Sequence, residues 1–162
     1  MIFFSDRSLK MLETASIWYA DGTFKAAPRS SKQLYTIHGI KNKQSFIFAF
    51  ILCQQKNETT YREIFSAIVQ KATSMNIHLN PRVIMVDFEK AAINAFRIHF
   101  PNAEIKGCWF HFTQAIHRKS KQIIGNKSSY IHKEWLAKFY ALALTPITHL
   151  REALAKIHIT VS

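Results

Sequence analysis

The arrangement of the chain is decided by residues 81–92, which read PRVIMVDFEKAA. After the proline comes a continuous apolar run, Val83–Val86, of the kind found in a strand covered on both faces, and it ends at Asp87. Apolar residues then recur at helical spacing behind Glu89, an acid suited to the first turn of a helix. The stretch therefore predicts a buried strand with an acidic end, followed by a helix.

Upstream of this stretch, the sequence predicts three strands in succession. Residues 17–24, IWYADGTF, are apolar and aromatic until Asp-Gly, which indicates a strand ending at an acidic turn. Further strands are expected over 34–40 and 45–53, joined by the polar turn 41–44. Three consecutive strands favour an antiparallel meander.

The remaining pattern predicts helices with one more strand between them. Apolar residues at helical spacing predict a helix between residues 59 and 72, and a strand is expected over 103–108. Helices are then expected from Phe110 to the Gly125-Asn126 pair, over 131–144, and over 146–157 with Thr145 as cap and Pro146 in the first position. The order β-β-β-α-β-α-β-α predicts a mixed α/β sheet with helices over its faces. This is the order of the ribonuclease-H-like fold, in which the first and fourth strands are neighbours.

Composition limits the partners that the chain could have. The 162 residues suit one domain with an appended helical segment, and 22 Lys and Arg against 10 Asp and Glu give a net charge of +12. Nucleic acid is the leading partner for such a charge, ahead of a merely solubilising basic surface and of an anionic membrane. Two cysteines cannot build a disulfide framework, and no signal peptide or membrane-length apolar run is present. We expect an intracellular protein that does not enter the membrane.

Two carboxylates are candidates for a metal site. If the first and fourth strands are neighbours, Asp21 and Asp87 come together at their ends, and paired carboxylates suit Mg²⁺, which prefers oxygen ligands. The alternative is structural, because Asp-Gly is a common turn and an Asp after a strand often caps the next helix. Glu89 is a further candidate ligand, although a helix-dipole role explains it equally well.

Three blocks between Tyr19 and His117 resemble the catalytic domain of Mutator-like element (MULE) transposases, a family within the DDE-type class. The blocks are ADGTF at 20–24 with a following Pro28, VIMVDFEKAA at 83–92, and FPNA at 100–103 running into CWFH at 108–111. Each block alone is a weak signal, but their order and spacing are fairly specific.

The resemblance implies catalytic and metal-binding roles for Asp21 and Asp87, as the first two acids of an Asp-Asp-Glu triad that holds two Mg²⁺ or Mn²⁺ ions. It also implies DNA as partner, a nuclear location, and oligomers of the intact family enzyme. The family's catalytic Glu follows a helical insertion, and neither Glu134 nor Glu152 lies in a matching motif. We therefore expect residues 1–125 to be the ribonuclease-H-like core and 126–162 to begin the insertion.

The expected function is that of a transposase fragment with little or no strand cleavage of its own. A non-catalytic DNA-binding or interaction module derived from a transposase is the alternative. A ribonuclease-H-type nuclease acting on RNA is a third hypothesis, which the fold permits and the Cys-x-x-His block disfavours.

The remaining motif residues have two interpretations each. Cys108 and His111 match the family's Cys-x-x-His signature and could supply half of a zinc site with His117 as third ligand, but without a second cysteine pair we favour buried packing and expect no zinc. Basic residues follow the acid and the signature, where they either hold DNA phosphates or form solvated surface. They are Lys25, Arg29, Lys32, Arg118, Lys119, Lys121 and Lys127.

Overall fold

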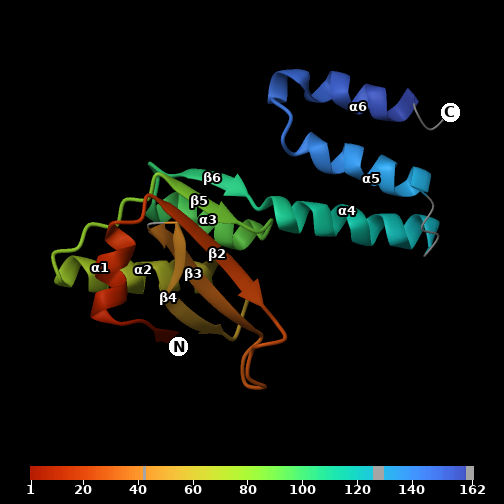
Figure 1. Cartoon of the computed structure of the whole chain (residues 1–162). Coiled ribbons are helices and arrows are strands. Elements are labelled where there is room, and N and C mark those ends of the chain that lie inside the picture. Colours follow the sequence, from red (N-terminus) through yellow and green to blue (C-terminus); the bar gives the residue numbers. More distant parts are fainter. Residues whose placement is uncertain (42, 126–129, 160–162) are drawn as a thin grey trace. The chain divides into compact units, whose positions relative to one another are not determined.

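A computed structural model of the chain describes residues 1–41, 43–125 and 130–159. It divides the chain into two compact units, Met1–Gly107 and Cys108–Ser162, and each is described by itself (Figure 1). Asn42 of the predicted turn, Asn126 of the predicted helix end and the predicted DNA contact Lys127 lie outside the described residues. The division into a family core and an insertion at residues 125 and 126 stays a prediction.

The first unit is an α/β structure built on one six-stranded sheet. Its elements in chain order are β1 (Ile2–Phe3), α1 (Asp6–Glu13), β2 (Ile17–Thr23), β3 (Gln33–Lys41), β4 (Gln44–Cys53), α2 (Glu58–Ser74), β5 (Val83–Val86), α3 (Lys90–His99) and β6 (Glu104–Gly107). The strands lie in the order β1-β4-β3-β2-β5-β6. From β2 onward, the predicted order of strands and helices is confirmed.

Pairing within the sheet is mixed, as the sequence predicts. Strands β2, β3 and β4 form an antiparallel meander, and β1 adds to β4 in the antiparallel direction. Strand β5 lies parallel to β2 and β6 lies parallel to β5. The first and fourth predicted strands, β2 and β5, are therefore neighbours although a hairpin and a helix separate them in sequence.

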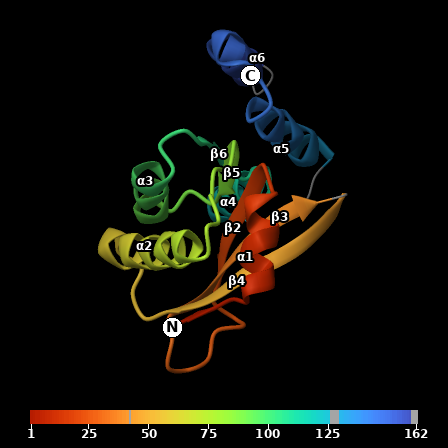
Figure 2. The same ribbon diagram turned by 90° about the vertical axis from the view of Figure 1, so that its left-hand side faces the viewer.

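One face of the sheet packs against the three helices of this unit. Side chains alternate along β2, so that Trp18 and Ala20 are buried while Tyr19 and Asp21 between them are half-buried. Helices α2 and α3 lie beside each other on one side of the sheet (Figure 2), where Phe65 stacks on Phe96 with ring centroids 4.0 Å apart. The core cluster joins residues of β2, β3, β4 and β5 to residues of α1, α2 and α3. Burial of this apolar face is the main stabilising contribution to the unit.

The second unit is helical. It contains α4 (Trp109–Ile124), α5 (Tyr130–Leu142), a short 3₁₀ helix (Ile147–His149) and α6 (Leu150–Ile159). The predicted start of the last helix is wrong, because Pro146 has the extended angles φ −54° and ψ 141° and precedes the 3₁₀ turn. Thr145 does not cap that helix, because its hydroxyl donates to the carbonyl of Ala141 at the end of α5. None of the described helices is long and apolar enough to cross a membrane.

Candidate metal and nucleic-acid site

Asp21 and Asp87 lie toward the carboxyl ends of the neighbouring parallel strands β2 and β5. The side of the sheet that these strand ends share is called the acidic edge below. The parallel register pairs Ala20 of β2 with Val86 of β5, and each acid is the next residue along its strand direction. The carboxyl ends of neighbouring parallel strands reach the same edge, which is where α/β sheets commonly bind ligands. The predicted meeting of these two acids is therefore supported by the strand register.

Two polar residues of β3 flank Asp21. Thr36 pairs with Asp21 across the antiparallel ladder and donates a long hydrogen bond of 3.4 Å to its backbone carbonyl. The Nε2 atom of His38 lies 2.8 Å from the Thr36 hydroxyl oxygen. Burial lowers the pKa of His38, and the negative charge of Asp21 partly offsets this effect. The pKa of the His38 imidazole therefore depends on the charge of Asp21.

Asp87 and Glu89 have different local roles. A carboxylate oxygen of Asp87 accepts a hydrogen bond of 3.0 Å from the backbone N–H of Glu89, which fixes the turn from β5 into α3. Glu89 is the N-cap residue of α3, not a member of its first turn as the sequence suggested, and it makes no side-chain cap bond. Its carboxylate instead pairs with the ammonium of Lys56 at 2.9 Å. Glu89 is only 13% exposed, so this ion pair is largely shielded from solvent.

Lys56 contacts residues that follow each of the two acids, namely Phe24 after Asp21 and Glu89 after Asp87. It follows β4, whose carboxyl end reaches the same edge as those of β2 and β5, because β4 is antiparallel to β3 and β3 to β2. Its ammonium lies 4.5 Å from the centroid of the Phe24 ring while it pairs with Glu89. Lys56 was not among the residues predicted from the sequence, because a lone lysine in the polar segment after a strand carries no local signal.

A buried polar layer lies behind the acids. Gln33 donates a short hydrogen bond to the hydroxyl of Tyr61, and the Tyr35 and Tyr61 rings meet edge to face at 5.1 Å. Within the described part of the chain, the Tyr35 hydroxyl has no hydrogen-bond partner. Burial raises the pKa of Tyr35 well above its usual range, and the negative charges of Asp87 and Glu89 raise it further. The layer is thus electrostatically coupled to the acidic edge.

The acidic edge fits a magnesium-type ion held by two carboxylates. Magnesium binds through one or two protein carboxylates and keeps several waters, so two carboxylates such as Asp21 and Asp87 are of the kind it would take. That they bind a metal stays a prediction. Among residues 1–41, 43–125 and 130–159, no group of three or more His, Cys, Asp or Glu side chains is arranged to hold a metal. Glu89 lies two residues beyond Asp87 but is held by Lys56.

The predicted basic contacts belong to two different parts of the chain. Lys25, Arg29 and Lys32 are exposed in the connection between β2 and β3, which leaves the arrowhead end of β2 (Figure 1) and therefore starts at the acidic edge. Arg118, Lys119 and Lys121 are exposed on α4 in the second unit. The structure is compatible with phosphate contacts by either group, and their role stays a prediction.

The Cys-x-x-His signature lies at the start of α4. Cys108 is the N-cap residue and His111 follows in the first turn, with its Nδ1 atom buried. The ring of His117 is 3.4 Å from the Tyr140 hydroxyl of α5. Among the described residues, Cys108, His111 and His117 are not part of a group of three or more His, Cys, Asp or Glu side chains that could hold a metal. The expectation that zinc is not bound stays a prediction.

Glu134 and Glu152, the two glutamates that follow the Cys-x-x-His signature, lie on helix surfaces. Glu134 pairs with Lys138 along α5 at 3.4 Å, and Glu152 pairs with Lys156 along α6 at 2.8 Å. The hydrogen bond from Lys156 and its charge lower the pKa of Glu152. Both are ordinary i, i+4 pairs on exposed helix faces.

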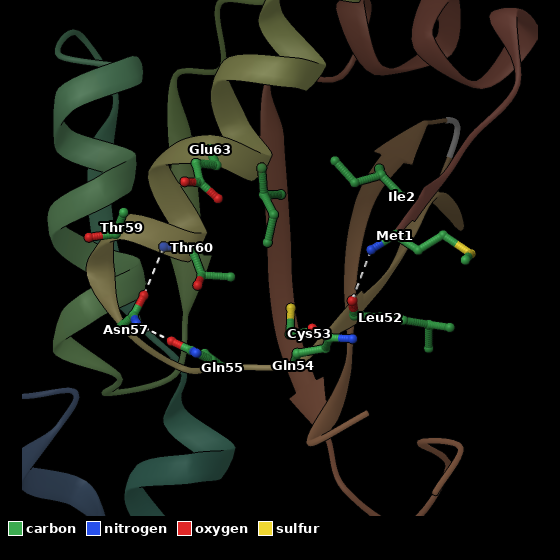
Figure 3. A pocket seen from close by; sticks show the side chains of 11 residues that line it. Met1, Ile2, Leu52, Cys53, Gln54, Gln55, Asn57, Thr59, Thr60 and Glu63 are labelled. Atoms are coloured by element: carbon green, nitrogen blue, oxygen red, sulfur yellow. Dashed lines mark hydrogen bonds between the residues drawn. The ribbon is translucent and has the colours of Figure 1, made fainter. Parts of the chain in front are cut away.

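A separate pocket of 660 Å³ lies between the N-terminal strand, the end of β4 and the start of α2 (Figure 3). It is lined by Cys53 and by polar residues that include Gln54, Asn57 and Glu63. Asn57 caps α2 by accepting from the backbone N–H of Thr60 at 2.8 Å. Neither Asp21 nor Asp87 lines this pocket, so it is not the acidic site.

Comparison with known protein families finds a match over most of the first unit. No curated protein matches the chain. The family model described as the MULE transposase domain matches residues 17–115, which is more than half of the chain and includes β2 with Asp21, β5 with the following Asp87, and the Cys-x-x-His signature. The chain therefore belongs to the MULE transposase domain family.

Proposed function

We propose that the chain is the core of a DDE-type DNA transposase, with a ribonuclease-H-like arrangement in which Asp21 and Asp87 hold Mg²⁺ or Mn²⁺. The register that brings Asp21 and Asp87 to adjacent strand ends is the observation that carries the proposal. The meander β2-β3-β4, with β5 parallel beside β2, supports the ribonuclease-H-like assignment. A nuclear location, which the family resemblance implies, is part of the same proposal.

When bound, a pair of such ions supplies charge stabilisation at the attacking and leaving oxygens of a phosphodiester. The protein's own residues hold the two carboxylates in place. Hydrogen bonding from the Glu89 N–H orients Asp87, and the ladder between β2 and β3 fixes Asp21 opposite Thr36. Exposed Lys25, Arg29 and Lys32 in the adjoining connection would bind phosphates of the DNA.

We propose further that this chain by itself cleaves DNA weakly or not at all. Asp21 and Asp87 each follow one residue of the register pair Ala20 and Val86, and the carboxylate of Glu89 is ion-paired with Lys56. The intact family enzyme would use a third acid and would act as an oligomer. The alternative proposal, a non-catalytic DNA-binding or interaction module, is supported by the charge of +12.

The first test measures Mn²⁺ binding by electron paramagnetic resonance. Asp21→Asn and Asp87→Asn should each weaken binding by at least about tenfold, since each removes one of two charged ligands. Asp6→Asn is a matched control, because Asp6 is an exposed acid on α1. Equal binding by all four proteins would refute the metal site.

The second test separates the functions. Incubation with supercoiled plasmid and Mg²⁺ should give negligible nicking, and robust nicking that Asp87→Asn abolishes would show an active enzyme. Salt-sensitive DNA binding that survives the double substitution of Asp21 and Asp87 by Asn would favour the binding module. Selective cleavage of an RNA–DNA hybrid would favour the RNA-directed nuclease.

A further inference from the structure

Two exposed phenylalanines follow the two acids closely in sequence. Phe24 follows the end of β2 three residues after Asp21 and is 60% exposed. Phe88 follows Asp87 directly and is 58% exposed. Large aromatic side chains exposed to this extent at a functional edge are candidates for contacts with a partner.

Both rings are positioned by neighbours. The ammonium of Lys56 lies 4.5 Å from the Phe24 centroid, and the same ammonium is held by Glu89 at 2.9 Å. The Phe88 ring lies against Gly107 of β6 so closely that a Cβ atom there would be 2.8 Å from two of its carbons. The aromatic rings are therefore set beside the acids and do not depend on the partner for their position.

The chemistry of this edge combines aromatic faces with positive charge. The ammonium of Lys56 contacts both Phe24 and Glu89. The connection after Phe24 carries the exposed Lys25, Arg29 and Lys32. Proteins that hold unpaired nucleic-acid strands use this combination, in which cations contact the backbone and bases stack on aromatic rings. Base pairs inside a duplex cannot offer their faces in this way.

We propose that Phe24 and Phe88 bind unpaired bases of the DNA strand next to the scissile phosphate, with Lys56 contacting the backbone. This inference rests on the proposed function and adds the form of its substrate: a strand end or junction in which bases next to the cleavage point are unstacked. Phe24 lies on the β2 side of the acids and Phe88 on the β5 side, so the two rings would contact the strand on either side of the metal-binding edge.

The test compares two DNA ligands of equal length and sequence on one strand, a blunt duplex and a duplex with an end forked by mismatches. Binding of the whole chain is measured by fluorescence anisotropy in low salt with EDTA, which prevents cleavage. The native protein should bind the forked DNA more tightly. Phe24→Ala and Phe88→Ala should each weaken forked binding by about 5- to 100-fold, the usual value of one stacked base, and leave blunt binding nearly unchanged.

Phe3→Ala is the matched control, because Phe3 is 49% exposed on β1 at the far edge of the sheet. Phe24→Trp should retain forked binding, which excludes a folding defect as the cause of the alanine result. A 2-aminopurine at an unpaired position should be quenched by the native protein and recover with Phe24→Ala or Phe88→Ala.

The outcomes separate this inference from the function on which it rests. Equal affinity for forked and blunt DNA, or a loss with Phe3→Ala as large as with the other two, overturns base stacking while DNA binding stands. Absence of salt-sensitive binding to both ligands overturns the DNA-binding role and this inference together.

Discussion

A methyl group added at Gly22 tests how tightly the buried polar layer is packed behind Asp21. The Cβ atom of an alanine there would lie 2.7 Å from Oε1 of Gln33 and 3.3 Å from Cδ2 of Tyr35. Both neighbours are 0% exposed, and Gln33 is also held by its hydrogen bond to Tyr61. Neither side chain has space to move away, so the overlap must be relieved by strain in the core.

The expected cost follows from two opposing effects. Overpacking of a well-packed core costs about 1–3 kcal/mol. Replacing glycine by alanine also restricts the unfolded chain, which returns about 0.4–1 kcal/mol where the backbone conformation suits alanine. Gly22→Ala should therefore lower the free energy of unfolding of the first unit by about 1–2 kcal/mol.

Gly107→Ala provides the control, because its Cβ would approach Phe88 at a similar 2.8 Å. Phe88 is 58% exposed, unlike the fully buried Gln33 and Tyr35, so displacing its ring loses less buried contact, and the destabilisation should be smaller than for Gly22→Ala. Urea unfolding followed through NMR signals of residues 1–107 measures the free energy of unfolding of the first unit alone. Equal losses for the two variants, or no loss for Gly22→Ala, would refute the argument that burial of the neighbours decides the cost.

Four further predictions concern the same unit. Asp21→Asn should lower the pKa of His38 further in an NMR titration, because the Asp21 charge now raises it; an unchanged pKa would mean that the two groups do not interact. Since the folded His38 pKa lies below its ordinary 6.5, its protonation opposes folding, and His38→Gln should reduce the loss of stability as the pH falls through 6.5 toward the folded pKa. Tyr61→Phe should cost about 1–3 kcal/mol in urea unfolding by leaving the buried Gln33 amide without its acceptor, and a neutral result would show that the hydrogen bond is dispensable. Asn57→Ala should cost about 1 kcal/mol by removing the N-cap of α2, whereas Asn57→Asp should cost little.

Most of the sheet could be predicted because its strands carry strong local patterns. The apolar run at 83–86, the Phe-rich run at 44–53 and the helical spacing in 58–74 each indicate one kind of element. The elements of residues 1–13 were not predicted, since β1 has two residues and α1 has eight. Ser5 and Ser8 form the capping box of α1, with serine where the common pattern has glutamate or glutamine.

The candidate site was only partly accessible from sequence. Asp21 and Asp87 could be singled out because each follows an apolar strand pattern, but the sequence does not show that Glu89 is paired with a lysine from another loop. That pairing depends on β4 ending at the same edge as β5, which is a property of the whole sheet. Lys56 and Tyr35 gain their relation to the acids only through long-range pairing, so no local motif could reveal them.

The predicted turn at Asp21-Gly22 is wrong, because β2 continues through both residues to Thr23, which pairs with Leu34 of β3. The position of Asp21 is set instead by the core. Side chains alternate along a strand, so a slip of one residue in β2 would turn Asp21 toward the helices and expose Trp18. Trp18 is 1% exposed and donates through its indole N–H to the carbonyl of Ala15 at 3.0 Å, so such a slip would lose both burial and this bond. The same apolar residues that hold the sheet together thus determine which face and which edge carry the carboxylates. A substitution that loosens this core should therefore weaken the proposed metal binding at the acidic edge even where it contacts neither acid.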